Sequence, residues 1–172
     1  MKIIILLFTV IILNTCLVTT VMAQHYQDDV VGSVIINIPI AITKTSDMNF
    51  GNIQVGSTAG TVVLAPGGGR TTTGVVTLPA STGTVQAASF TVTGNANTTY
   101  SITLPTTPLT ITDPVSTKTM TVSNFTSNPT PTGILTGGSQ TINVGAKLIV
   151  GASQTGGAYT NATGFAVTVN YN

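Results

Sequence analysis

The sequence predicts an all-β fold, a β-sandwich of about nine short antiparallel strands. Threonine is the dominant polar residue and alternates with Val, Ile and Phe, as in residues 89–93 and 165–169. β-Branched residues at period two are typical of strands. No stretch carries an apolar period of 3.6, and Gly and Pro interrupt every window long enough for a helix. Short strands over about 150 residues imply two sheets packed face to face, or an open barrel.

The first four expected strands lie before residue 80. The first of them alternates large aliphatic residues with others, and Pro39 within it indicates an edge or a kink between two short strands, 31–38 and 40–43, because proline cannot donate to a β-ladder. A Pro-Gly-Gly-Gly turn at 66–69 separates the third strand from the fourth. The four strands are expected at 33–43, 47–50, 60–65 and 72–78.

The later strands are separated by turn clusters rich in Gly, Asn and Pro, at 94–97, 128–131 and 156–157. Each strand is a run of β-branched and aromatic residues between two such clusters. They are expected at 87–94, 98–104, 108–112 with 118–123, 140–151 and 164–171.

Three of these strands carry one apolar face, which is expected to line the core. Side chains two residues apart point to the same side of a strand, so the alternation gives the buried side directly. The faces consist of Ile142, Val144, Ala146, Leu148 and Val150; of Phe165, Val167, Val169 and Tyr171 in the C-terminal strand; and of Tyr100, Ile102 and Leu104.

Charged residues are unusually rare. The chain has five Lys and Arg, four Asp, no Glu and one His in 172 residues, so that 5% is charged, against about 25% in ordinary soluble domains. A chain without a basic run cannot neutralise a row of phosphates, which excludes nucleic-acid binding as its function. Attraction to anionic membranes is excluded for the same reason.

The N-terminus has the pattern of a secretory signal peptide, residues 1–23. A positive start is followed by an apolar stretch over 3–21, and small residues allow cleavage between Ala23 and Gln24. A membrane anchor is the alternative, because about 19 apolar residues lie near the lower limit for spanning, and Cys16 would allow a lipoprotein. A polar stretch follows at once, without a basic stop-transfer cluster. We therefore expect contact with a membrane only through the cleaved signal peptide.

Cleavage would leave 149 residues (172 − 23) without cysteine. Disulfides and thiol chemistry are then ruled out, and the mature chain has four positive and four negative charges. We divide it into a polar extension, 24–32, and a single β-sandwich domain, 33–172. Export without disulfides suits a bacterial periplasm, cell surface or extracellular fibre.

The mature chain is poorly provided with catalytic groups. General acid–base catalysis needs a positioned His or a pair of carboxylates, and the single His lies two residues from the expected cleavage point. Asp47 and the Asp113-Pro114 pair are typical of turns. The sequence at 67–70, Gly-Gly-Gly-Arg, lacks the Lys and the following helix of a phosphate-binding loop, and indicates a hairpin turn. We expect no catalytic residue, no metal and no cofactor.

The N-terminal aliphatic run is the most informative feature. Val34, Ile36, Ile38, Ile40 and Ile42 lie on one face of an extended chain. Burying all of them would contribute roughly 7–15 kcal/mol as an upper bound. In one interpretation this run is the first strand of its own sheet. In the other, Val34, Ile36 and Ile38 leave their own subunit and complete the sheet of a neighbour.

Sparse charge favours the second interpretation. Natural sheets protect exposed edges with charges, Pro or bulges, and eight charges must serve about nine strands. Strand addition between subunits hides such edges, with main-chain hydrogen bonds for strength and pockets for alternate side chains. Head-to-tail addition does not close and so generates a fibre.

Three segments resemble a bacterial family of short exported β-proteins, domain of unknown function 4402. They are residues 42–53 (Ile-Thr-Lys-Thr-Ser-Asp-Met-Asn-Phe-Gly-Asn-Ile), the turn at 66–70, and the ending at 164–172 (Gly-Phe-Ala-Val-Thr-Val-Asn-Tyr-Asn). A looser resemblance links the chain to chaperone–usher pilins and spore coat protein U. It implies an immunoglobulin-like sandwich, an N-terminal donor strand matched by Val34, Ile36 and Ile38, and the penultimate Tyr171.

The sequence therefore favours a non-enzymatic structural subunit of a bacterial surface fibre or coat. Its partners would be further copies of itself, with a periplasmic chaperone and usher implied by the pilin resemblance. The alternative is a monomeric surface module that recognises glycans through its Asn/Thr-rich loops.

Overall fold

The computed structural model describes residues 31–172, and the chain divides after Ile35 into two parts that are treated separately. Residues 31–35 form neither strand nor helix. The second part is built from ten strands and one short 3-10 helix, η1 (Thr136–Gly138). The predicted all-β antiparallel sandwich is confirmed. The strands are β1 (Ala41–Ser46), β2 (Gly60–Leu64), β3 (Arg70–Gly74), β4 (Ala88–Thr93), β5 (Thr99–Thr103), β6 (Leu109–Thr112), β7 (Thr119–Asn128), β8 (Thr132–Ile134), β9 (Ser139–Val150) and β10 (Thr168–Tyr171).

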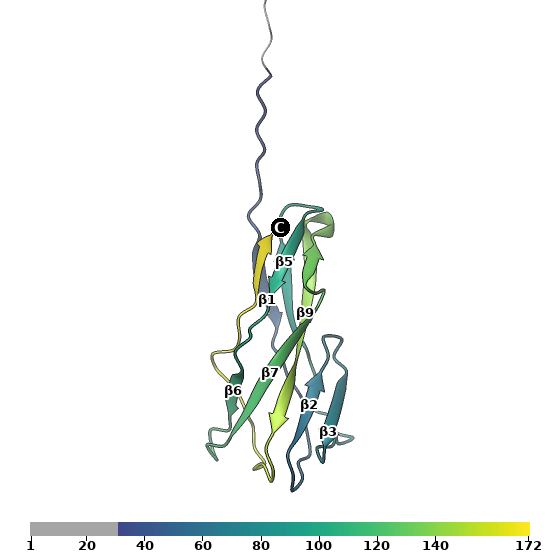
Figure 1. Cartoon of the computed structure of the whole chain (residues 1–172), viewed down its shortest axis with the longest axis vertical. Helices are drawn as coiled ribbons and strands as arrows, with labels where there is room; N and C mark the ends of the chain where they lie inside the picture. Colours follow the sequence, from purple (N-terminus) through teal and green to yellow (C-terminus); the bar gives the residue numbers. More distant parts are fainter. Residues whose placement is uncertain (1–30) are drawn as a thin grey trace, which may run out of the picture. The chain divides into compact units, whose positions relative to one another are not determined.

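Two sheets make up the described domain (Figure 1). The large sheet has the order β1-β4-β9-β2-β3, and β7 with β6 is added on the other edge of β9. The small sheet has the order β10-β5-β8. All pairs are antiparallel.

The long strand β9 changes partner half-way along one edge. Residues 139–144 pair with β4, and residues 146–150 pair with β2. Gly145 lies at the change, where a Cβ atom would collide with the backbone carbonyl oxygen of Leu64. Glycine is required because the neighbouring backbone approaches too closely for any side chain.

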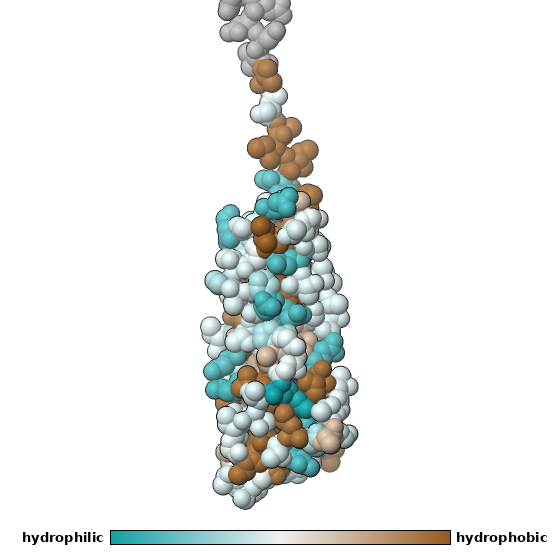
Figure 2. Space-filling model, turned by 90° about the vertical axis from the view of Figure 1, so that its right-hand side faces the viewer, coloured by the Kyte–Doolittle hydropathy of each residue, from teal (hydrophilic) through white to brown (hydrophobic). Residues whose placement is uncertain are grey.

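The core consists of two clusters, one at each end of β9. The first joins the large sheet to the small sheet and contains Ala88, Phe90, Val92, Tyr100, Leu135, Ile142, Val144 and Val169. The second contains Val62, Val76, Met120, Val122, Ala146, Leu148 and Val150, with no residue from the small sheet. We call the end with the first cluster the two-sheet half, and the end with β2, β3 and β6 the open half. Figure 2 shows hydrophobic surface in the open half, where no second sheet covers the first.

The predicted apolar faces are confirmed. All five residues of the 142–150 face are buried. Tyr100 and Val169 are buried as well, whereas Ile102, Leu104, Phe165, Val167 and Tyr171 are half-buried and pack against the first cluster.

Several predicted strand boundaries are wrong. The first strand begins at Ala41 and runs to Ser46, instead of covering 33–43, because Pro39 has no N–H to donate. Residues 47–50 form no strand and contribute only an isolated bridge from Asn49 to Gln86. Neither residues 33–40 nor residues 47–50 are hydrogen-bonded to a neighbouring strand along their length. Side-chain alternation alone does not show whether such a partner strand exists.

Other strands are shorter than predicted, or were missed. The fourth predicted strand, 72–78, is β3 (Arg70–Gly74), which ends at Gly74 with φ of +70°. The last, 164–171, is β10 (Thr168–Tyr171) only. β8 was not predicted, because its Thr-Gly-Ile sequence stands next to a Pro-rich turn.

Candidate functional site

An apolar groove lies on the open half of the domain. Its volume is about 540 Å³. The floor consists of side chains from β6, β7 and β9, and the two walls are the segments that follow β1 and precede β10. The floor residues are Leu109, Ile111, Met120, Val122 and Leu148; one wall carries Met48, Phe50, Ile53 and Val55, and the other carries Gln154, Tyr159, Asn161 and Phe165. Met120, Val122 and Leu148 belong to the second core cluster and are themselves buried, so the groove lies directly over that cluster without uncovering it.

The first wall, residues 47–55, is held by backbone bridges and by one arginine. Asn49 pairs with Gln86, and Gln54 pairs with Thr77. The Arg70 guanidinium donates to the carbonyl oxygens of Phe50 at 2.5 Å and of Asn52 at 2.9 Å. These bonds replace a continuous ladder and leave Phe50 half-buried against the second cluster.

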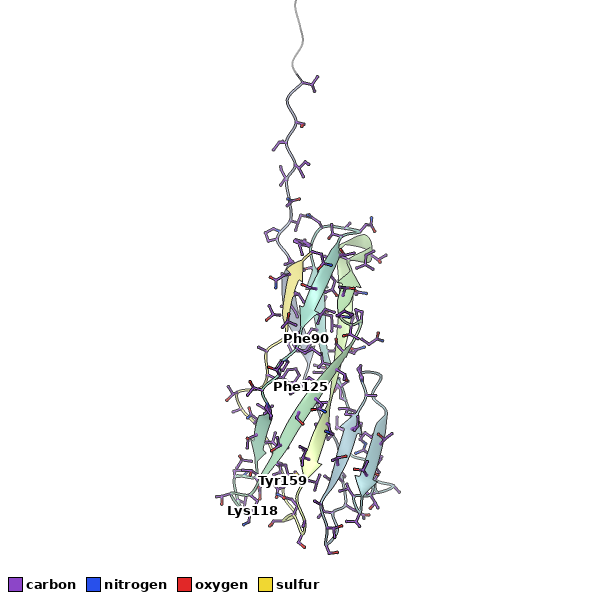
Figure 3. All side chains as sticks on the ribbon, in the orientation of Figure 1. Phe90, Lys118, Phe125 and Tyr159 are labelled. Atoms are coloured by element: carbon purple, nitrogen blue, oxygen red, sulfur yellow. The ribbon has the colours of Figure 1, made fainter. Side chains whose placement is uncertain are left out.

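The second wall, residues 154–165, is held by side-chain hydrogen bonds and by a backbone bridge from Thr160 to Thr112 in β6. Gln154 donates to the Thr119 carbonyl at 3.1 Å and to the Tyr159 hydroxyl at 2.9 Å, and that hydroxyl donates to the Thr155 carbonyl at 2.6 Å. Asn161 donates to the Thr110 carbonyl at 2.6 Å. Tyr159 lies in the open half (Figure 3).

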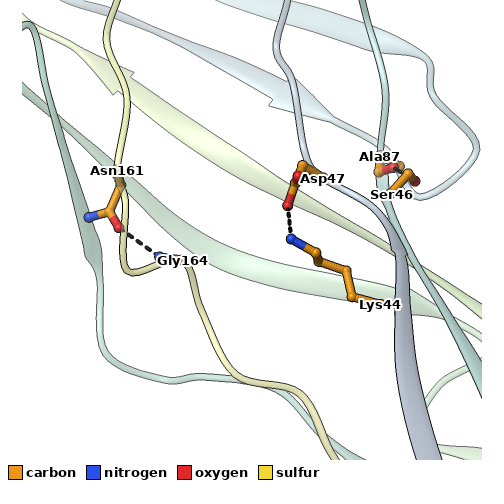
Figure 4. A network of polar contacts seen from close by, with 6 residues as sticks. All are labelled: Lys44, Ser46, Asp47, Ala87, Asn161 and Gly164. Carbon is orange, nitrogen blue, oxygen red and sulfur yellow. Dashed lines mark hydrogen bonds and ion pairs between the residues drawn. The ribbon is translucent and has the colours of Figure 1, made fainter.

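The Asn161 side chain also shapes the turn that follows it. Its Oδ1 accepts hydrogen bonds from the backbone N–H groups of Thr163 and Gly164, at 2.8 and 2.7 Å. Figure 4 shows this turn on one segment and Asp47 on another, with strands of the sheet behind them. Both Asp47 and Asn161 line the groove.

Aromatic rings close the groove toward the two-sheet half. The ring of Phe165 lies 4.7 Å from that of Phe125 and 6.3 Å from that of Phe90, between ring centroids. Phe90 and Phe125 lie near the middle of the domain (Figure 3). Since Phe125 packs against both clusters, these rings join the two cores.

Charge contributes little to the groove. Lys44 and Asp47 form an ion pair of 2.6 Å at its edge, with side chains 58% and 82% exposed. Exposed pairs of this kind contribute about 0–1 kcal/mol. The floor is apolar and the walls also carry polar side chains, so the groove suits an occupant with apolar side chains toward the floor and polar groups toward the walls.

The described residues offer little for metal chemistry. Within 31–172, no three His, Cys, Asp or Glu side chains lie close enough together to hold a metal ion. No helix in this part of the chain is long and apolar enough to cross a membrane.

Asp113 caps a turn, as its sequence context predicts. The carboxylate accepts hydrogen bonds from the Ser116 hydroxyl and from the backbone N–H groups of Ser116 at 3.0 Å and Val115 at 3.3 Å. The Ser116 hydroxyl is the main cause that lowers the pKa of Asp113. Asp113 is not among the residues that line the groove.

The glycine-rich turn is also a hairpin. Residues 66–69 connect β2 to β3, with the Ala65 N–H donating to the Gly69 carbonyl at 2.8 Å. The hairpin places Arg70 at the start of β3, from which it reaches the first wall.

The aliphatic segment, residues 34–38, is exposed where the structure describes it. Ile36 and Ile38 are 84% and 58% exposed, and Val34, in the part described separately, is 83% exposed. Ile40 and Ile42 instead pack against the first cluster. One alternating run is thus divided between exposed residues and half-buried residues that pack against the core.

The C-terminal strand holds the backbone near this division. The Tyr171 hydroxyl donates to the Ile38 carbonyl at 2.8 Å and accepts from the Asn95 N–H at 2.6 Å. The Asn95 side chain accepts from the Ile38 N–H at 2.7 Å. The other predicted residues of this strand, Phe165, Val167 and Val169, face the core.

Sequence reasoning missed the two groove walls. It also missed the roles of Arg70 and Asn95. The first wall carried a signal, because Met48 and Phe50 alternate with polar residues next to a glycine. The expected cleavage site at Ala23 and Gln24 lies outside the described residues, as does most of the polar extension 24–32.

Residues 40–171 match the family model described as Domain of unknown function (DUF4402). The chain belongs to this family. The matched region of this DUF4402 protein begins at Ile40, so the aliphatic segment lies outside it. It includes β1 to β10 and both walls of the groove. Neither the curated proteins nor the solved structures give a match.

Proposed function

We propose that this chain is a non-enzymatic, exported structural subunit of a bacterial surface fibre or coat, pilin-like in its assembly. The aliphatic segment of one copy adds as a strand to the groove of the next copy. The observation that carries this proposal is a groove with an apolar floor in a domain that leaves Ile36 and Ile38 exposed.

The edges of the two sheets support strand addition. β1 and β10 are each the terminal strand of a described sheet, and they contact each other. The groove continues between the segments that follow β1 and precede β10. A strand placed there would lie along the two wall segments and direct alternate side chains to the floor.

The energy available from this contact is substantial. Burying Val34, Ile36 and Ile38 would contribute about 4.5–9 kcal/mol at roughly 1.5–3 kcal/mol each, as an upper bound. Main-chain hydrogen bonds would add to it. A periplasmic chaperone and usher, the partners that the pilin resemblance implies, would assist this assembly.

The reach of the chain favours a second copy as the occupant. Val34 is four residues from Ile38, a span of at most about 14 Å. Along the strands, Asp47 is nine residues beyond Ile38, about 30 Å, and Phe165 is six residues before Tyr171, about 20 Å. These lengths, each an upper limit set by an extended chain, favour the groove of a second copy over that of the segment's own domain while Ile38 stays bonded to Tyr171.

Two aspartate substitutions in the mature chain test the proposal. Ile36→Asp places a charge on the alternating face, and Ile35→Asp places the same charge on the opposite face. We expect wild type and Ile35→Asp to polymerise, and Ile36→Asp to stay monomeric, in sedimentation and electron microscopy. An added peptide of residues 24–38 should cap growing ends.

Two results would contradict the proposal. One is polymerisation of Ile36→Asp at the wild-type rate. The other is a wild-type chain that remains monomeric at high concentration, which would favour the monomeric module that recognises glycans through its Asn/Thr-rich loops.

A further inference from the structure

Two side chains hold the backbone at the base of the aliphatic segment. Both backbone groups of Ile38 are bonded, the N–H to Asn95 Oδ1 at 2.7 Å and the carbonyl to the Tyr171 hydroxyl at 2.8 Å. Asn95 Nδ2 also donates to Asn37 Oδ1 at 3.2 Å. We call Asn95 and Tyr171 the clamp.

Asn95 and Tyr171 are themselves held in place by the backbone around them. Asn95 lies in the turn between β4 and β5, where the Asn97 N–H donates to the Leu135 carbonyl at 2.7 Å and the Thr98 hydroxyl donates to the Asn95 carbonyl at 2.7 Å. Gly94 is buried beneath the Tyr171 hydroxyl, and a Cβ atom there would collide with it. The turn therefore accommodates Tyr171 because position 94 has no side chain.

The chain between the clamp and the core has little freedom. Only Pro39 separates the clamped Ile38 from Ile40, which packs against the first cluster. Proline fixes its own φ and restricts the preceding residue to extended backbone. No glycine lies between 38 and 50 to act as a hinge.

We propose that Asn95 and Tyr171 are positioning residues that fix the base of the aliphatic segment, so that the junction between successive copies is stiff. This inference rests on the proposed function, because the junction exists only if the segment enters a second copy. The clamp holds the backbone at Ile38 before assembly, which reduces the conformational entropy lost when the segment binds. In the fibre it fixes the angle between neighbouring domains.

Paired variants separate the clamp from general stability. Tyr171→Phe removes only the hydroxyl, and Asn95→Leu removes both polar atoms at similar size. Asn95→Asp keeps the oxygen that accepts from the Ile38 N–H and should restore the wild-type behaviour. Thr168→Val with Asn170→Ala is the control, since it removes one hydroxyl and one amide from exposed positions of the same strand.

The first measurement is amide hydrogen exchange at Ile38, in full mature chains kept monomeric by Ile36→Asp. We expect exchange about tenfold faster with Tyr171→Phe and Asn95→Leu combined, because each hydrogen bond contributes about 0.5–1.5 kcal/mol. Exchange at Val144 in the core serves as the reference for global stability. Unchanged exchange at Ile38 would contradict the assignment of Asn95 and Tyr171 as the residues that hold its backbone.

The second measurement is the persistence length of the fibres in electron micrographs. We expect a several-fold decrease for the combined variant, and no decrease for the control or for Asn95→Asp. Fibres of unchanged stiffness despite faster exchange at Ile38 would overturn the stiff junction and leave the proposed function intact. A wild-type chain that forms no fibre would overturn both the proposed function and the stiff junction, whatever the exchange rate at Ile38.

Discussion

Replacing Arg70 by Met should loosen the first wall of the groove. The substitution keeps a long apolar stem but removes the guanidinium, which donates to the Phe50 and Asn52 carbonyls at 2.5 and 2.9 Å. A hydrogen bond to a charged group contributes about 1.5–3 kcal/mol. Because Arg70 is half-buried and water can replace part of the loss, we expect a destabilisation of about 2 kcal/mol, or about 4–8 °C in Tm.

Urea denaturation followed by far-UV circular dichroism measures this loss. The control is Lys118→Met, which removes one positive charge from an exposed residue in the open half (Figure 3). We expect the control to change the free energy of unfolding by less than about 0.5 kcal/mol. Equal destabilisation by the two substitutions would show that Arg70 acts through charge, and would refute its assignment as the residue that holds the wall.

Two further predictions concern the core and a turn. Gly145→Ala should destabilise the domain by about 1–3 kcal/mol, because the added Cβ collides with the Leu64 carbonyl. The control in the same thermal melts is Gly67→Ala, whose added Cβ meets open space. Equal changes in Tm for the two variants would contradict the collision. The lowered pKa of Asp113 means that its contribution to stability is present above the ordinary value of 3.8 and is lost as pH falls through the folded value. Asp113→Asn should therefore be less stable at pH 7 and lose less stability on acidification; parallel urea titrations at pH 7 and pH 3 that match wild type would contradict this.

The core strands could be predicted because their apolar side chains recur every two residues, which is the period at which a β-strand directs side chains to one face. In β9, the alternating face from Ile142 to Val150 is buried throughout, and the strand has partners on both edges. The alternation therefore gave both the strand and its buried side. β4 and β5 were predicted within one residue at each end for the same reason.

The start of the first strand was misplaced because alternation does not show which of its apolar residues another part of the domain covers. Ile36 and Ile40 have the same chemistry and the same spacing, yet one is exposed and the other packs against the core. Between them, the Ile38 N–H is bonded to Asn95, which lies 57 positions further along the chain. A contact of this separation leaves no local signal.

The groove was missed for a related reason. Its walls are held by isolated backbone bridges and by single hydrogen bonds from side chains to distant carbonyls, such as Arg70 to Phe50 and Asn161 to Thr110. These bonds follow no period. The floor, by contrast, is made of residues from predicted strands, such as Ile111, Val122 and Leu148.

The partner change of β9 has a mechanical consequence. Twelve residues of one strand are bonded to β4 at one end and to β2 at the other, with β7 along the opposite edge. Tension applied along this strand would load rows of hydrogen bonds in shear, so that many must break together rather than one after another. We expect a high unfolding force when the domain is pulled along β9 in single-molecule experiments, and a lower one when β3 is peeled from the sheet edge.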